Sequence, residues 1–214
     1  GEAYVYGERA LAVNPIVTPD MSFLDVLKEK ISLQLAFLSN RELLPTGKDD
    51  AERQKALPYP LLMEDDTLAK KADWMSKFIY EETYELLQEN KQVLEHLRQA
   101  GYPMVLVSNF YGNINQVLKD AGIDGYFQQV IESAVVGVRK PNPAIFALGV
   151  CALDLPASQV LVVGDTYGKD IVPAHKLGCH TLWIKGLQWE EKPVDETVPD
   201  GIIRKLSEME DYLN

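Results

Sequence analysis

Val160-Leu-Val-Val-Gly-Asp-Thr-Tyr-Gly-Lys-Asp170 holds a strand pattern, a turn and a possible helix start within one short segment of this 214-residue chain. Its first four residues are apolar and mostly β-branched, which is typical of a strand buried on both faces. Gly164 permits a sharp turn, and Asp165 follows at the carboxyl end of the strand. Asp165 and Asp170 together favour a hard cation such as Mg2+, although a turn residue and a helix-capping residue would give the same pattern.

Two other segments also carry polar residues, one at the end of a strand pattern and one in a loop before a helix pattern. Met104-Val-Leu-Val-Ser-Asn109 is a second buried strand pattern, and it ends in a hydroxyl and an amide. Gly137-Val-Arg-Lys-Pro-Asn-Pro143 is a loop that carries a cation and leads into a helix. Ligands of open α/β sheets bind outside the carboxyl ends of the strands, so we expect the polar residues of the three segments to converge. These residues are Ser108, Asn109, Lys140, Asp165 and Asp170.

The order of these motifs resembles that of the haloacid dehalogenase-like (HAD) hydrolase superfamily, in the helical-cap branch of phosphoglycolate phosphatases and haloacid dehalogenases. Ser108-Asn109 matches the second motif, Lys140-Pro141 the third, and Gly164-Asp165 with Asp170 the fourth. The resemblance implies that Ser108 and Asn109 donate hydrogen bonds to a phosphoryl group and that Lys140 neutralises its charge. It also implies Asp165 and Asp170 as the Mg2+ site, with Asp170 holding a metal-bound water or pairing with Lys140.

The first motif of the superfamily, Asp-x-Asp-x-Thr at the end of the first strand, is not found. Ala10-Leu-Ala-Val13 is a possible strand, and Asn14-Pro-Ile-Val-Thr18 follows it. In that register Asn14 replaces the nucleophile, Ile16 replaces the general acid, and Thr18 matches. One hypothesis is therefore a degraded first motif; the other is an acidic motif removed before Gly1. We favour degradation, because a parallel sheet without its central strand would expose unpaired edges.

An acidic segment elsewhere in the chain, Glu64-Asp65-Asp66-Thr67, is similar to the first motif. It follows two prolines rather than a strand and leads directly into a helical pattern. The acids are therefore interpreted as helix-capping residues, and Asp65 and Asp66 are the next candidates if the first motif has been placed wrongly.

The alternation of strand and helix patterns after Met104 predicts a doubly wound, Rossmann-like α/β core with a parallel sheet. Residues 1–19 and 101–214 are assigned to this core, and 20–100 to an inserted α-helical cap. Within the cap we expect helices from Ser22, from Thr67 to Glu89 and from Val93 to Ala100. Within the core we expect further elements, namely strands at Val130–Val136 and Thr181–Ile184 and a terminal helix at Gly201–Leu213.

The amino-acid composition of the chain limits the kinds of partner that it is expected to bind. The net charge is −11 and there is no block of Lys or Arg, which argues against nucleic acid and anionic membranes. No apolar run is long enough to span a bilayer, and no signal peptide pattern is found. Cys151 and Cys179 lack the spacing of a disulfide framework, so reduced thiols in the cytoplasm are expected.

The family resemblance implies a Mg2+-dependent phosphatase of small phosphate esters that works through an aspartyl-phosphate. The dehalogenase branch is disfavoured, because it does not need the metal site. A neutral amide at position 14 is a poor nucleophile and Ile16 cannot donate a proton, so the chain is predicted to be inactive or nearly so. The alternative is a non-catalytic pseudophosphatase that binds a small phosphorylated molecule or inorganic phosphate, or serves as an interaction protein.

Overall fold

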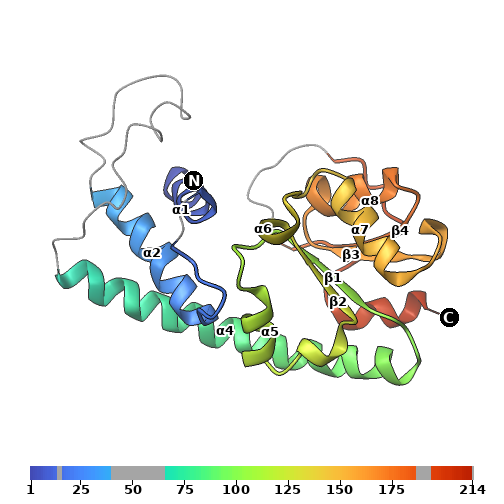
Figure 1. Ribbon diagram of the computed structural model, residues 1–214, viewed down its shortest axis with the longest axis horizontal. Helices are drawn as coiled ribbons and strands as arrows, with labels where there is room; N and C mark the ends of the chain where they lie inside the picture. Colours follow the sequence, from blue (N-terminus) through green and yellow to red (C-terminus); the bar gives the residue numbers. More distant parts are fainter. Residues whose placement is uncertain (14–15, 40–65, 187–193, 214) are drawn as a thin grey trace. The chain divides into compact units, whose positions relative to one another are not determined.

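The computed structural model describes residues 1–13, 16–39, 66–186 and 194–213, and Figure 1 labels their helices and strands. The residues form two compact units, Gly1–Leu86 and Leu87–Asn214. The predicted domain boundaries, at 19/20 and 100/101, are different and stay a prediction. Helix α4, Asp66–Gln99, contributes residues to both units.

In the first unit, the segment expected to be the first strand is helical. Helix α1 spans Glu2–Val13, so the strand predicted at Ala10–Val13 is wrong. Its buried residues Tyr6, Ala10 and Leu11 follow helical spacing, and the Tyr6 ring lies 5.0 Å from the ring of Phe37 on the neighbouring helix. The run Ala-Leu-Ala favours a helix by intrinsic propensity, and burial on one face stabilises it further.

Helix α2, Phe23–Ser39, confirms the helix predicted from Ser22. The Asp25 N–H donates to Ser22 Oγ at 3.2 Å, and Ser22 Oγ donates to the Asp25 carboxylate at 2.6 Å. The two bonds are the N-terminal cap that the sequence indicated.

The two helices predicted between Thr67 and Ala100 are one continuous helix, α4. The residues between them, Asn90-Lys-Gln92, include no Pro or Gly that would break the backbone. The helix ends where predicted: Gly101 has φ +84°, and the Tyr102 N–H donates to the Leu97 carbonyl at 3.0 Å. No helix in the described ranges combines the length and the apolar character needed to cross a bilayer.

The second unit is the α/β core, and its strands are all parallel, which confirms the predicted fold class. Strand β1, Val105–Ser108, pairs with β2, Gln129–Glu132. Strand β4, His180–Ile184, pairs with β3, Leu161–Gly164, on one side and with β5, Gly201–Ile203, on the other. The connecting α-helices are α5 Ile114–Asp120, α6 Ser133–Val136, α7 Ala144–Leu153 and α8 Val172–Lys176. Shorter turns are the 3-10 helices η2 Asp124–Tyr126 and η3 Ala157–Gln159 and the π-helical turn η4 Tyr167–Ile171.

Two predicted elements of the core are corrected. The strand expected over Val130–Val136 ends at Glu132, and Ser133–Val136 is the short helix α6. The helix expected over Gly201–Leu213 begins as strand β5 and continues as the 3-10 helix η5, Leu206–Tyr212. Gly201 allows the ring of Tyr212 to lie against the strand, since a Cβ there would be 2.3 Å from that ring.

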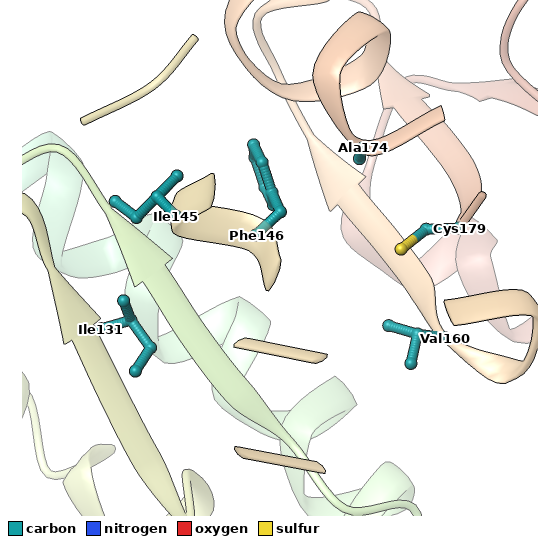
Figure 2. Packing of buried hydrophobic residues seen from close by; sticks show 6 residues of the cluster. All are labelled: Ile131, Ile145, Phe146, Val160, Ala174 and Cys179. Carbon is teal, nitrogen blue, oxygen red and sulfur yellow. The ribbon is translucent and has the colours of Figure 1, made fainter. Parts of the chain in front are cut away.

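The β1–β2 pair and the β3–β4–β5 sheet share two hydrophobic cores. On one face, Val105, Val107 and Val162 pack against a cluster built around Phe146 of α7. Figure 2 shows the Phe146 ring between Ile131 and Ile145 on the β1–β2 side and Val160, Ala174 and Cys179 on the β3 side. On the other face, Met104, Leu161 and Val163 pack with residues of α4 and η5.

Strands β1 and β3 nevertheless have no hydrogen bonds to each other in the described part of the chain. Each is paired on one side only, and all residues of both strands are half-buried although they are mostly apolar. Among the described residues, each strand therefore has an unpaired edge.

Candidate functional site

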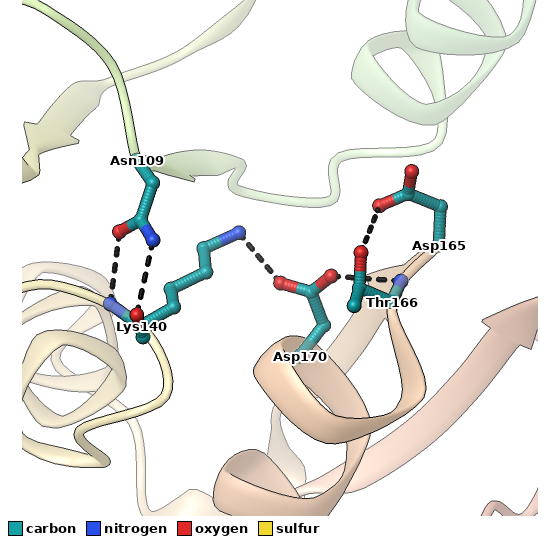
Figure 3. A network of polar contacts seen from close by, with 5 residues as sticks. All are labelled: Asn109, Lys140, Asp165, Thr166 and Asp170. Carbon is teal, nitrogen blue, oxygen red and sulfur yellow. Dashed lines mark hydrogen bonds and ion pairs between the residues drawn. The ribbon is translucent and has the colours of Figure 1, made fainter. Parts of the chain in front are cut away.

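The carboxyl ends of β1 and β3 carry the polar residues that the sequence singled out, and Figure 3 shows their arrangement. Asn109 follows β1, Lys140 lies in the loop between α6 and α7, Asp165 follows β3, and Asp170 lies in η4. A chain of hydrogen bonds joins these four residues through Thr166. Ser108 is the last residue of β1, directly before this network.

Asn109 fixes the Lys140 loop to the end of β1. Its side-chain Nδ2 donates to the Lys140 carbonyl at 3.0 Å, and the Lys140 N–H donates to Asn109 Oδ1 at 2.8 Å. The two bonds use both ends of the amide and hold one residue of the loop in place. A contact of Asn109 with a phosphoryl group would therefore use its backbone N–H or the second hydrogen of Nδ2.

Lys140 and Asp170 form a buried ion pair. The Lys140 Nζ lies 2.7 Å from Asp170 Oδ1, and the two side chains are 17% and 6% exposed. The other carboxylate oxygen, Oδ2, accepts the Thr166 N–H at 3.0 Å. Pairing with Lys140 was one of the two roles expected for Asp170, and the bond from Thr166 supplies a further partner that a buried carboxylate needs.

Gly164 is required by the position of Asp170. A Cβ at residue 164 would lie 2.4 Å from the Asp170 Cβ, closer than two such atoms can approach. The glycine that ends β3 therefore lets the carboxylate lie against the strand and reach Lys140.

Asp165 differs from Asp170 because it is exposed. Its backbone carbonyl accepts the indole N–H of Trp183 at 3.1 Å, and Trp183 is fully buried. Within the described residues, the hydrogen bond to its carboxylate comes from the Thr166 hydroxyl and is long, 3.4 Å. The backbone of Asp165 is thus fixed by the core, while its carboxylate is available to a ligand.

A cation site built from protein ligands alone is absent from the described ranges, which contain no group of three or more His, Cys, Asp or Glu placed to hold a metal. Of the two acids, Asp170 already binds Lys140 and Thr166, and Asp165 has free oxygen atoms. Mg2+ commonly keeps several waters and uses one or two carboxylates together with a phosphate. The donor set therefore fits a Mg2+ ion that binds with a phosphate, and does not fit a closed metal cage.

Sequence reasoning missed Glu132, the last residue of β2. It is 2% exposed, and its Oε1 accepts the Gly112 N–H at 2.6 Å. The signal was present, because an acid ends the apolar pattern Val130-Ile131 where a strand buried on both faces would be apolar.

Of the residues proposed for the first motif, the structure describes Ile16 and Thr18. Asn14 lies outside the described residues, and Ile16 is a half-buried turn residue of the first unit. Thr18 is exposed and donates its hydroxyl to Asp20 at 2.6 Å. The segment before Asn14 is helix α1 rather than a strand, so the roles of Asn14 and Ile16 stay predictions without the strand that was expected to position them.

Comparison with known proteins gives consistent results. A family model described as haloacid dehalogenase-like hydrolase matches residues 23–178. The phosphoglycolate phosphatase of Vibrio parahaemolyticus is 32% identical over 120 residues, which are 56% of this chain and 52% of that protein. The (S)-2-haloacid dehalogenase 2 of a Pseudomonas species is 30% identical over 128 residues, 59% of this chain and 55% of that protein. The chain spans about half the length of the curated relatives it matches.

A solved structure agrees with these relatives. The crystal structure of a predicted phosphoglycolate phosphatase from Haemophilus somnus has a TM-score of 0.54 and 21% identity, covering 100% of this chain and 91% of that one. At this identity the likeness establishes the fold alone. The family model, by contrast, covers more than half of the chain, including all three motifs at Ser108, Lys140 and Asp165. The chain belongs to the haloacid dehalogenase-like hydrolases.

Proposed function

We propose that the chain binds a small phosphate ester, or inorganic phosphate, at the carboxyl ends of β1 and β3. The observation that carries the proposal is the Lys140 ammonium, which is held 2.7 Å from Asp170 next to the end of β1. A largely buried cation of fixed position can neutralise a phosphoryl oxygen better than a mobile surface Lys, because water screens it less. Ser108 would donate its hydroxyl to the same group.

Mg2+ would bind at Asp165 together with the phosphate, and Asp170 would stay close to it while pairing with Lys140. When bound, the ion would neutralise charge on the phosphoryl oxygens. Asp165 supplies the ligand, Trp183 fixes its backbone, and Lys140 limits the net negative charge of the two acids. The Vibrio relative supports this substrate class, because it is a phosphoglycolate phosphatase.

For catalysis we propose that the chain is inactive or nearly so on phosphate esters. Of the described acids at the ends of the strands, we assign Asp165 to Mg2+, and Asp170 pairs with Lys140, so neither is left to act as a nucleophile. If Asn14 stands at the nucleophile position, its amide lacks the charge needed for attack on phosphorus. A non-catalytic phosphate-binding protein is the second candidate, and the lack of a further acid for the nucleophile among the described site residues favours it.

Titration calorimetry with inorganic phosphate, with and without Mg2+, tests the binding proposal. We expect millimolar binding that Mg2+ strengthens, and loss of measurable binding in Lys140→Met. Lys119→Met is the matched control, because it removes an exposed Lys of the same unit outside the site. Absence of heat in the unmodified protein at millimolar phosphate, or equal binding by the two variants, would refute the proposed pocket.

Hydrolysis of an aryl phosphate distinguishes the enzyme from the pseudophosphatase. We expect background turnover in the unmodified chain, some Mg2+-dependent turnover in Asn14→Asp with Ile16→Asp, and less in Asn14→Asp alone. General acid catalysis contributes roughly 10²–10⁴-fold where it operates, which is why the double change should exceed the single one. Robust activity that survives Asn14→Ala would show that the first motif lies elsewhere, with Asp65 and Asp66 the next residues to replace.

A further inference from the structure

We infer that Glu132 is a positioning residue of the phosphate site, acting through the loop between β1 and α5. The inference rests on the proposed function, because it concerns how Ser108 and Asn109 are held for phosphate. Glu132 ends β2, and the parallel register places it opposite Ser108. It is therefore one strand away from the residues that would contact phosphate.

The carboxylate of Glu132 binds the far end of that loop. Its Oε1 accepts the Gly112 N–H at 2.6 Å and the Ile114 N–H at 3.4 Å. Gly112 has φ +108°, so the backbone reverses at the point where the carboxylate holds it. The neighbouring Ser133 hydroxyl adds a weaker bond to the Phe110 carbonyl, 3.4 Å.

The near end of the loop is held by a different element. Asn109 bonds the backbone of Lys140 in both directions, as described above. Asn109 and Gly112 are thus fixed from two sides, by the Lys140 loop and by Glu132, with Phe110 and Tyr111 between them. Movement of one end would be transmitted to the Lys140 backbone through the Asn109 amide.

A purely structural role explains Glu132 less well. Its second oxygen, Oε2, is buried and has no hydrogen-bond partner among the described residues. Burying a carboxylate with one oxygen unsatisfied costs free energy, and an apolar side chain at the end of a buried strand would avoid that cost. An apolar side chain cannot accept charge-assisted hydrogen bonds from the backbone N–H groups of Gly112 in the loop and Ile114 at the start of α5.

The test compares Glu132→Met, which removes the acceptor, with Glu132→Gln, which keeps a neutral one. We expect phosphate affinity to fall about tenfold in the Met variant and about threefold in the Gln variant, in the order of the hydrogen-bond strengths lost. Thr181→Val is the matched control. It removes another fully buried polar atom without a described partner, near the start of β4 and away from the site, so its phosphate affinity should be unchanged.

Amide hydrogen exchange gives a readout that needs no ligand. In the Met variant, the amides of Gly112 and Ile114 should exchange faster, and so should that of Lys140, which Glu132 does not touch. Faster exchange at Gly112 and Ile114 with Lys140 unchanged and phosphate affinity intact would reduce Glu132 to a structural role. If the unmodified protein binds no phosphate, the proposed function fails, while the Lys140 amide still decides whether the loop is coupled.

If Glu132→Met does not fold, the same phosphate affinity and amide exchange are measured on Glu132→Gln and Ser133→Ala. Ser133→Ala removes only the bond to the Phe110 carbonyl, so we expect a loss of about twofold in phosphate affinity. Unchanged affinity and unchanged Lys140 exchange in both variants would overturn the inference.

Discussion

At the scale of single residues, the ion pair of Lys140 and Asp170 should dominate the stability of the site. Replacing Lys140 by Met leaves a carboxylate that is 6% exposed, with the Thr166 N–H as its described partner. Breaking a buried pair in this way costs about 3 kcal/mol of unfolding free energy. Urea unfolding of Lys140→Met, Asp170→Asn and the double variant measures the coupling, and we expect the double variant to be more stable than the sum of the single losses predicts. Simple additivity would mean that the pair contributes no coupling energy.

Gly164 should tolerate no side chain. Gly164→Ala places a Cβ 2.4 Å from the Asp170 Cβ, so η4 must shift and the bond to Lys140 must lengthen. We expect a loss of about 2 kcal/mol in unfolding free energy, as for other overpacked sites, and weaker phosphate binding. Gly168→Ala is the control in the same turn, because a Cβ there meets no atom within 4 Å. Equal melting temperatures for the two variants would contradict the packing argument.

The identity of the site residues could be predicted from sequence, but their contacts could be predicted only in part. Ser108 and Asp165 end or follow an apolar strand pattern, and Lys140 lies in a loop bounded by Gly137 and Pro141, so their local sequence marks them. The two hydrogen bonds between the Asn109 side chain and the Lys140 backbone join residues 31 positions apart, and no local sequence pattern encodes them. Glu132 interrupts an apolar strand pattern, but its partners, Gly112 and Ile114, are 20 and 18 positions away, so its contacts could not be predicted.

At the scale of elements, Asp200 joins the two last strands of the sheet. Its carboxylate accepts the Thr181 N–H at 2.7 Å and lies 3.1 Å from His180 Nδ1, while its own N–H donates to the Thr181 carbonyl at 2.9 Å. Partial burial favours the neutral acid, but the bonds from Thr181 and His180 outweigh it and hold the pKa of Asp200 below its usual value. The charged carboxylate therefore stabilises the start of β4 and the approach to β5.

This pKa predicts the direction of a pH effect. A carboxyl group whose pKa is lower in the folded state contributes its full stability above the unfolded pKa of about 3.9 and loses it as the pH falls through the folded value. The difference in urea midpoint between the unmodified protein and Asp200→Asn should thus be largest near neutral pH and shrink below about pH 4. Asp211→Asn, at an exposed position, is the control. A difference that stays constant down to pH 2 would exclude this role.

Elements were predictable where the hydrophobic period was unambiguous. The strands at Val105 and Leu161 and the capped helix from Ser22 fall into this class. Ala10–Val13 is too short for its period to separate strand from helix, and packing of α1 on α2 decides for the helix. Gly201-Ile-Ile203 was assigned to a helix because Ile203, Leu206 and Met209 follow helical spacing, whereas the pairing of this segment with β4 is not encoded locally.

At the scale of the whole molecule, the net charge of −11 should make cation binding sensitive to salt. Screening shortens the range of the surface potential from about 30 Å at 0.01 M to about 8 Å at 0.15 M ionic strength. We expect the apparent Mg2+ affinity to fall at least about threefold over this range of KCl concentration. Asp165→Asn is the control, because its residual Mg2+ binding reports the acidic surface alone. An affinity that does not depend on salt would indicate a closed, desolvated site instead.

The overall architecture was predictable from the alternation of strands and helices, but the continuity of its sheet was not. We favoured a degraded first motif because a missing central strand would leave unpaired edges on β1 and β3. In the described residues those edges are unpaired, and the segment chosen for the central strand is helix α1. The degraded first motif therefore stays a prediction, because the local sequence does not identify a segment that covers these edges.

The edges of β1 and β3 that no described segment pairs with also affect how the protein behaves in concentrated solution. Val105-Leu-Val-Ser108 and Leu161-Val-Val-Gly164 are short, uncharged and rich in β-branched residues, which is the composition of segments that stack into amyloid-like fibrils. Incubation at high concentration should therefore produce thioflavin-positive aggregates after a lag phase, and seeding should shorten the lag. Leu106→Lys, at a half-buried residue of β1 outside the two hydrophobic cores described above, would place a charge on β1 and should suppress this fibrillation.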